Sequence, residues 1–144
     1  EPIRKDIKDL EVEDLEPVDV LVAGFPCQAF SVAGHRKGFD DDRGNLFFQI
    51  MRIVEELKEK PTVILLENVK NFHTHDDGNT FAKVFEELEA AGYCVWNKVL
   101  NTSAITKIPQ NRQRTFLVCF NEGAGPSDPS KKLSWAFKQK FSNR

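Results

Sequence analysis

Short, continuously apolar runs alternate with helix-patterned stretches along this chain, and this alternation constrains its fold more than any other feature. Four runs rich in β-branched residues predict strands, at residues 18–24, 62–68, 94–100 and 115–120. Because the runs are apolar almost throughout, they are typical of parallel strands that are covered on both faces.

Two stretches between these runs have helical periodicity. One apolar stripe predicts a helix over residues 45–60, ended by a proline, and a second predicts a helix over residues 79–92. Asn79 or Thr80 could cap the second helix, and Gly92 suits its end. Alternating strands and helices imply an α/β fold, here a partial doubly wound, Rossmann-like sheet. The first strand has no expected partner on one flank, so we expect a fragment or a chain completed by another.

Length and charge limit the class of protein. With 144 residues the chain can form one domain with a modest core. Its 20 Lys and Arg against 22 Asp and Glu give a net charge of −2, which counts mildly against nucleic-acid binding. The 3 cysteines lack disulfide or metal spacing and indicate a reducing, cytoplasmic setting. No run is long enough to span a bilayer and no secretory signal is present, so no membrane association is expected.

Potentially reactive residues follow the first two predicted strands. Cys27 comes directly after Pro26 in GFPCQAFS, and Glu67 closes the run TVILLE. Loops past the carboxyl ends of strands carry the chemistry of such sheets, so a Cys27 thiolate and a Glu67 proton donor could serve one substrate. Against this, a cysteine is more often a buried small side chain, and a strand-end glutamate can simply face water.

Two arginines alternate into the last predicted strand. In QNRQRTFLVCF, the period-two spacing of Gln110, Arg112 and Arg114 puts them on one face. This pattern fits a solvated edge strand, and it also fits two guanidinium groups that hold an anion or a carbonyl oxygen. His73 and His75 stand without a further ligand at metal-site spacing, so we expect solvated loop histidines and no metal site.

Together, these motifs resemble those of the cytosine-5 DNA methyltransferases, in particular the modification enzymes of bacterial restriction systems. GFPCQAFS is similar to that family's nucleophile loop, ENV at residues 67–69 to its catalytic carboxylate motif, and QNRQR at residues 110–114 to its paired-arginine motif. KDI at residues 5–7 resembles the turn that holds the cofactor adenine. The motifs stand in family order over about residues 5–120, which makes the resemblance specific.

The resemblance implies methyl transfer from S-adenosylmethionine to carbon 5 of cytosine in double-stranded DNA, through a covalent cysteine intermediate and a flipped base. It implies Cys27 as the nucleophile, Glu67 as the acid, Arg114 at the cytosine carbonyl oxygen and Arg112 as an orienting group. The further implied contacts are Asp6, Ile7, Pro26 and Leu46 with the cofactor, and Gln28, Ser31 and Arg43 with DNA.

The chain also departs from the family pattern. It lacks the glycine-rich loop expected before Glu1, and the target-recognition region and closing motifs expected after Phe120. Residues 1–120 are therefore interpreted as the central catalytic segment and residues 121–144 as a linker or tail. The open alternatives are an inactive fragment, one subunit of a split methylase completed by a second chain, an RNA methylase, and a cysteine hydrolase with His35 as its base.

Overall fold

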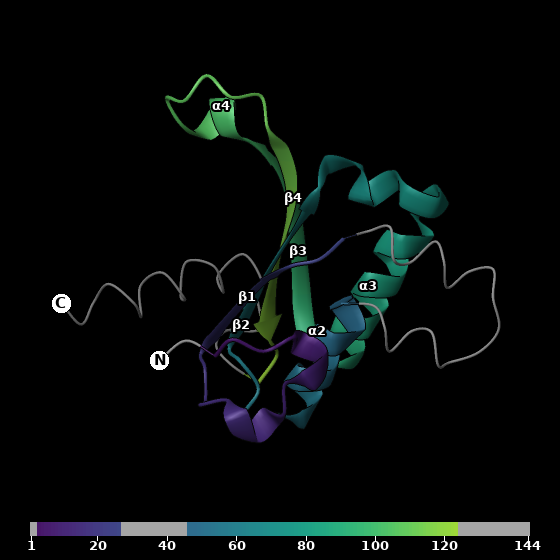
Figure 1. Ribbon diagram of the computed structural model, residues 1–144. Helices are drawn as coiled ribbons and strands as arrows, with labels where there is room; N and C mark the ends of the chain where they lie inside the picture. The colour runs from purple at the N-terminus through teal and green to yellow at the C-terminus, as the bar shows by residue number, and fades with distance from the viewer. Residues whose placement is uncertain (1–2, 27–45, 124–144) are drawn as a thin grey trace.

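The computed structural model describes residues 3–26 and 46–123, which form a four-stranded sheet with helices packed against it (Figure 1). The expected α/β architecture is confirmed, and each of the four apolar runs overlaps one strand. The strands are β1 (Val20–Gly24), β2 (Val63–Val69), β3 (Tyr93–Asn101) and β4 (Gln113–Asn121). The helices are α2 (Leu46–Glu56), α3 (Asn79–Ala90) and the single turn α4 (Thr102–Ile105), with 3₁₀ segments η1 (Ile7–Asp9), η2 (Val12–Asp14) and η4 (Lys70–Gly78).

The direction of the last strand differs from the expectation. The sheet order is β1-β2-β4-β3, and β1 pairs with β2 in parallel, from Val20 opposite Val63 to Gly24 opposite Glu67. β4 runs antiparallel to both of its neighbours, so the expectation of parallel strands throughout is wrong for β4. The reason is that only residues 102–112 join β3 to β4, and a parallel pair needs a crossover of about a dozen residues or more.

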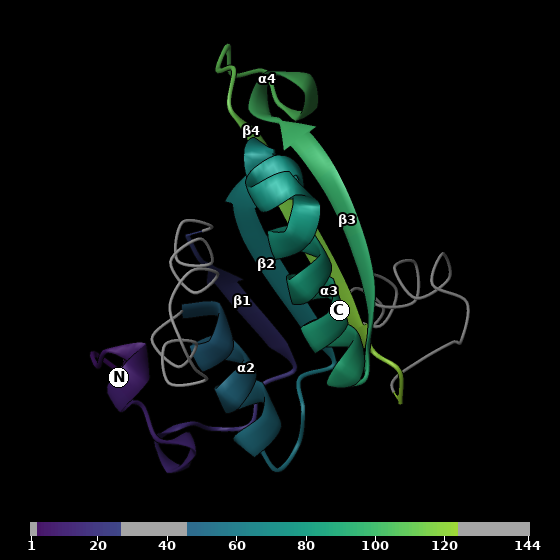
Figure 2. The ribbon, with the colours of Figure 1, turned by 90° about the vertical axis from the view of Figure 1, so that its right-hand side faces the viewer.

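Helices α2 and α3 lie on the same face of the sheet (Figure 2). On that face the strand residues Ile64, Leu66 and Leu117 are fully buried. On the other face, Val20, Val22 and Trp96 keep 41%, 68% and 45% of their surface exposed. The expectation of strands covered on both faces is therefore wrong for the part of the chain that the structure describes, because its helices pack on one side only.

An aromatic cluster anchors the chain where it leaves β1. The ring of Phe25 is buried, with its centroid 5.2 Å from that of Phe47 on α2 and 5.7 Å from that of Phe72 on η4. Burying such a ring contributes about 1.5–3 kcal/mol to folding. Phe25 therefore fixes the carboxyl end of β1 against two other elements.

The ends of the helices differ in part from the sequence patterns. Helix α2 buries the predicted stripe but ends at Glu56, one turn before Pro61. Helix α3 begins after Gly78, whose φ of 89° at the N-cap position is accessible mainly to glycine, so the expected cap by Asn79 or Thr80 is wrong. At its other end Gly92 has a φ of 88° and follows the C-cap, as expected.

The two histidines before α3 are packed rather than solvated. The ring of His73 lies 4.3 Å from that of Phe81, and His75 Nδ1 lies 2.7 Å from the buried Thr80 Oγ1. The expectation of solvated loop histidines is wrong because η4 folds them onto the first turn of α3. Among the described residues, no group of three or more His, Cys, Asp or Glu is placed to hold a metal ion.

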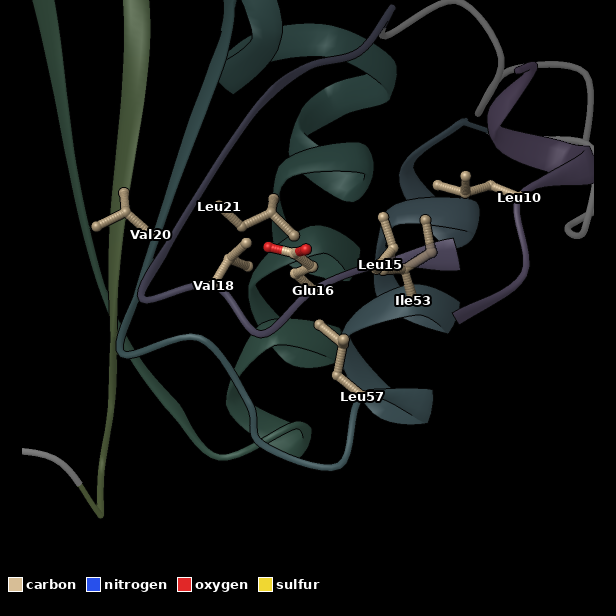
Figure 3. Close-up of a pocket in the computed structure, with 8 residues that line it drawn as sticks. All are labelled: Leu10, Leu15, Glu16, Val18, Val20, Leu21, Ile53 and Leu57. Carbon is tan, nitrogen blue, oxygen red and sulfur yellow. The ribbon is translucent and has the colours of Figure 1, made fainter. Parts of the chain in front are cut away.

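The N-terminal segment lies against α2. Arg52 donates through Nη2 to the carbonyl oxygens of Ile7 at 3.1 Å and Leu10 at 2.9 Å, so η1 is tied to this helix. Next to this contact, an apolar hollow of about 250 Å³ opens between the segment, β1 and α2 (Figure 3). Its lining consists of Leu10, Leu15, Glu16, Val18, Val20, Leu21, Ile53 and Leu57. Within residues 3–26 and 46–123, no helix has the length and hydrophobicity to cross a membrane.

Candidate active site

A second hollow lies at the carboxyl ends of β1 and β2. These strands are parallel and in register up to Gly24 and Glu67, so the residues that follow both strands meet at one edge of the sheet. The hollow has a volume of about 270 Å³. It is lined by Phe25, Pro26, Glu67, Asn68, Val69, Arg112 and Arg114.

Both predicted arginines reach the Glu67 carboxylate. Arg114 Nε lies 2.8 Å from Glu67 Oε1, and Arg112 Nη2 lies 3.9 Å from the same oxygen. The side chain of Arg114 is 24% exposed and that of Arg112 is 51% exposed, so Arg114 is the closer and less exposed partner. The structure thus brings together three of the sequence-predicted residues, and a purely solvated edge strand does not account for Arg114.

The second oxygen of Glu67 faces the end of β1. A methyl group built onto Gly24 would stand 3.6 Å from Glu67 Oε2, so this carboxylate oxygen lies directly over a residue that has no side chain. No hydrogen bond to Oε2 comes from the residues that the structure describes. The two carboxylate oxygens therefore differ in environment: Oε1 pairs with Arg114, and Oε2 lies over Gly24.

Asn68 is a site residue that the sequence reasoning missed. It is 2% exposed, its Nδ2 donates to the carbonyl oxygen of Phe25 at 2.8 Å, and its Oδ1 accepts from the Val69 amide at 2.8 Å. The sequence held a signal for this role. Every second residue of β2 is buried, namely Ile64, Leu66 and Asn68, and an asparagine occupies the third of these positions, where an apolar residue is expected. A buried amide at such a position needs partners, and these lie in the hollow.

The residues predicted to line a cofactor come from the η1 turn, the end of β1 and the start of α2. Ile7 and Leu46 both pack partly buried against the core, and Arg52 bonds the Ile7 carbonyl to α2. Asp6 caps η1, its Oδ1 accepting from the Lys8 amide at 3.0 Å. Pro26 is exposed and lines the hollow beside Glu67.

The predicted nucleophile Cys27 and the predicted DNA contacts Gln28, Ser31 and Arg43 lie outside the described residues, as does His35 of the hydrolase alternative. The other two cysteines are poor nucleophile candidates. Burial raises the pKa of the Cys119 thiol to about 12, which leaves almost no thiolate near neutral pH. Cys94 on β3 pairs with Phe120 on β4, whereas Glu67 pairs with Phe116 on the same strand. Phe120 and Phe116 are four residues apart, which separates Cys94 from Glu67 by about 13 Å along the strand direction.

A family model describing C-5 cytosine-specific DNA methylases matches residues 1–143. The chain belongs to this family. The resemblance inferred from the motifs of the nucleophile loop, the carboxylate and the paired arginines is therefore confirmed.

Relatives with curated names support the same assignment. The type II methyltransferase M.Bsp6I of Bacillus sp. (strain RFL6) is 51% identical over 116 residues, which make up 80% of this chain and 36% of that protein. M.HhaI of Haemophilus parahaemolyticus is 48% identical over 115 residues, again 80% of this chain and 34% of the relative. This family member thus spans about a third of the length of these two relatives.

Solved structures agree on the fold. The crystal structure of S. pombe Dnmt2 methyltransferase superimposes with a TM-score of 0.64 at 25% identity, over 86% of this chain and 38% of that one. A putative DNA modification methyltransferase encoded within an E. coli prophage gives a TM-score of 0.61 at 25% identity. The expected Rossmann-like methyltransferase sheet is confirmed.

Proposed function

We propose that this chain is part of an enzyme that transfers a methyl group to carbon 5 of cytosine in double-stranded DNA. The observation that carries the proposal is the Glu67–Arg114 pair beside Pro26, the residue before Cys27, in a chain of the C-5 cytosine-specific DNA methylase family. In this proposal residues 1–120 form the catalytic segment and residues 121–144 a linker or tail.

The chemistry requires carbon 5 to become nucleophilic. The Cys27 thiolate bonds to carbon 6, the electrons of the 5,6 double bond shift toward carbon 4, and ring nitrogen 3 takes up a proton from Glu67. Carbon 5 then bonds to the methyl group that S-adenosylmethionine supplies when bound. Loss of the carbon 5 proton to a base and cleavage of the carbon–sulfur bond release the thiolate, and return of the nitrogen 3 proton to Glu67 restores the ring.

The contacts of Glu67 and Arg114 suit these roles. With Oε1 held by Arg114, Glu67 offers Oε2 to ring nitrogen 3 from a fixed position. Arg114 uses Nε for Glu67 and Nη1 for the Gln113 carbonyl oxygen at 2.8 Å. Its Nη2 has no partner among residues 3–26 and 46–123, so it can donate to the cytosine carbonyl oxygen, while Arg112 orients the carboxylate from the exposed side.

The residues around η1 fit an adenine group of S-adenosylmethionine. The Asp6 carboxylate uses Oδ1 for the turn and retains Oδ2, which can accept from an amino group. Ile7 and Leu46 offer partly buried apolar surface to a flat ring, and Pro26 lines the hollow together with Glu67. These four residues would hold the cofactor.

The substrate must enter as a flipped base. The hollow that Glu67 lines has a volume of about 270 Å³, and an enzyme that acts on a base takes that base out of the stacked duplex to reach its ring. Gln28, Ser31 and Arg43 would contact the DNA backbone, which supplies most of the affinity without reading sequence.

A mechanism-based trap tests the proposal in the longest reading frame that contains this chain. The protein is incubated with S-adenosylmethionine and a pool of duplexes carrying 5-fluorocytosine, whose fluorine cannot leave as a proton. We expect a cofactor-dependent covalent adduct that peptide mapping assigns to Cys27. Cys27→Ser should form no adduct and still bind DNA.

The other outcomes point to the alternatives. An adduct at Cys94 would refute the assignment of Cys27 as the nucleophile. Acylation of Cys27 by an ester substrate with no adduct to DNA would refute the proposal and favour a hydrolase. Adduct formation only when tRNA carrying the same base replaces DNA would assign the substrate to RNA.

A further inference from the structure

The amide of Asn68 lies in the apolar interior at the point where the β1–β2 ladder ends. The last paired residues are Gly24 and Glu67, so the carbonyl of Phe25 lies one residue beyond the ladder. Asn68 Nδ2 donates to that carbonyl oxygen at 2.8 Å, and the amide is 2% exposed. A side-chain hydrogen bond thus extends the connection between the two strands by one residue.

This bond acts on a residue that is also held by its ring. Phe25 packs between Phe47 and Phe72, which fixes the position of its side chain but leaves the orientation of its carbonyl open. The bond from Asn68 fixes the carbonyl, and with it the plane of the peptide that joins Phe25 to Pro26. Because a proline also fixes its own φ, little freedom remains up to residue 26.

The same side chain is tied to the strand that carries Glu67. Asn68 directly follows Glu67, and its Oδ1 accepts from the Val69 amide at 2.8 Å. The amide is thus bound at both ends, to β2 on one side and to the residue after β1 on the other. A displacement of Asn68 would therefore change the position of Pro26 relative to Glu67.

We propose that Asn68 is a positioning residue, which sets the direction in which the chain enters Cys27 relative to the Glu67 carboxylate. The inference rests on the proposed function, since it assigns to Asn68 the task of aligning a nucleophile and an acid. Misplacement of reacting groups by about 1 Å can cost about 100-fold in rate.

The competing explanation is that the Asn68 amide only provides a hydrogen bond to the buried Phe25 carbonyl oxygen, and so contributes to stability but not to catalysis. The chain offers a matched control, because Tyr93 Oη donates to the Pro61 carbonyl oxygen at 2.8 Å and is equally buried. This bond has the same type and length, but it lies at the start of β3, away from the hollow. Tyr93→Phe therefore measures the effect of losing such a bond on stability alone.

The experiment compares Asn68→Leu, Asn68→Asp and Tyr93→Phe in the longest reading frame that contains this chain. For Asn68→Leu we expect kcat to fall about 10- to 100-fold, with the KM values for DNA and cofactor little changed. Tyr93→Phe should lower the melting temperature and leave kcat unchanged. A kcat for Asn68→Leu within about twofold of wild type would overturn the proposal, as would an equal loss in Tyr93→Phe.

Asn68→Asp adds a readout that a structural role would not move. When protonated, the introduced carboxyl can donate to the Phe25 carbonyl oxygen; when ionised, it can only accept and repels that oxygen. We therefore expect the ratio of its kcat to that of wild type to rise as the pH falls, whereas the ratio for Asn68→Leu stays constant. A constant ratio for both variants would count against the proposal.

A transfer-independent measurement separates this inference from the proposed function. Alkylation of Cys27 by iodoacetamide is followed by peptide mapping, with Cys94 as the internal standard. If wild type transfers no methyl group, the proposed function fails, and the inference then stands only if Asn68→Leu changes the Cys27 rate without changing the Cys94 rate. Equal Cys27 rates in Asn68→Leu and wild type overturn it.

Discussion

The two oxygens of the Glu67 carboxylate have different environments. Oε1 is bound by Arg114 and approached by Arg112, whereas Oε2 lies over Gly24. A carboxylate held on one side and open on the other has a fixed orientation without losing access to a ligand. This asymmetry is what a group that serves a ring nitrogen requires.

Glu67→Gln tests this assignment. The substitution keeps the shape of the side chain but removes the proton that the acid would give, so we expect methyl transfer to fall by about 10²- to 10⁴-fold. The lost ion pair is partly exposed and should cost at most about 1 kcal/mol of stability. Transfer assays and thermal melts of the longest reading frame measure both quantities.

Glu87→Gln is the matched control, because Glu87 pairs with Lys83 at 2.7 Å on α3, outside the hollow. It should melt like wild type and transfer like wild type. A Glu67→Gln protein that is inactive because it is unfolded would show that Glu67 is structural, and one that is fully active would remove it from the mechanism.

The sequence identified the charged residues of the candidate site but not its neutral residue, Asn68. Glu67, Arg112 and Arg114 could be found because charges after or within apolar runs are costly to bury and therefore conspicuous. Asn68 was missed because an asparagine at the end of a strand is usually part of a turn, and its partner Phe25 is 43 residues away in the chain. Hydrogen bonds over such a separation cannot be read from local pattern.

The sequence predicted which segments form strands and helices, but not the direction of every strand or the sheet face on which the helices pack. The hydrophobic pattern located all four strands as continuous apolar runs and both long helices as apolar stripes with a period of 3.6. It gave the wrong direction for β4, because an apolar run of six residues looks the same in either direction and the 102–112 connection was not read as a hairpin. It also predicted that both faces of the sheet are covered, whereas α2 and α3 pack on the same face.

Arg52 makes the contacts that join the N-terminal segment to α2. All three guanidinium nitrogens are used: Nε bonds Gln49, Nη1 bonds Glu56, and Nη2 bonds the carbonyl oxygens of Ile7 and Leu10. A planar fork with five donors can satisfy all four acceptors at once, and a lysine ammonium cannot. Arg52 therefore joins η1, which carries two predicted cofactor contacts, to α2, which carries a third.

Arg52→Lys should loosen η1 while leaving the sheet intact. We expect a loss of about 1.5–3 kcal/mol, the range for hydrogen bonds to charged groups, measured by urea unfolding. Hydrogen exchange should quicken at the Asp9 and Leu10 amides, which close η1 onto Asp6 and Ile7, and remain slow in β2 and β4.

Lys83→Ala, which removes an ion pair on α3, is the control and should leave the exchange of η1 unchanged. Unchanged protection of Asp9 and Leu10 in Arg52→Lys would mean that the turn is held by its apolar contacts and not by the guanidinium group.

Among the residues that the structure describes, the sheet has an unpaired edge at β1 and one face that no helix covers. β1 is the outermost strand, and Val20 and Val22 on it are among the more exposed apolar side chains of the described residues. Edge strands of monomers usually carry charges, prolines or bulges that prevent pairing, and VLVAG contains none of these. The apolar hollow beside β1 adjoins this edge (Figure 3). Such an edge is suited to further protein, from the same polypeptide or from a second one.

The final prediction concerns the 144-residue polypeptide in isolation, which we expect to transfer no detectable methyl group from labelled S-adenosylmethionine to any duplex. Its candidate cofactor contacts come from the η1 turn, Pro26 and the start of α2, and its matched residues cover 36% of M.Bsp6I and 34% of M.HhaI. Activity should appear when segments that cover the β1 edge are supplied in cis or in trans, with a β1 variant such as Val22→Lys failing to be complemented because a buried charge opposes pairing. Filter-binding of the duplex measures the labelled methyl groups transferred, both by the isolated polypeptide and after the segments are added. Methylation by the isolated polypeptide at a rate unaffected by added segments would show instead that these residues suffice, and that the open edge has no part in assembling the site.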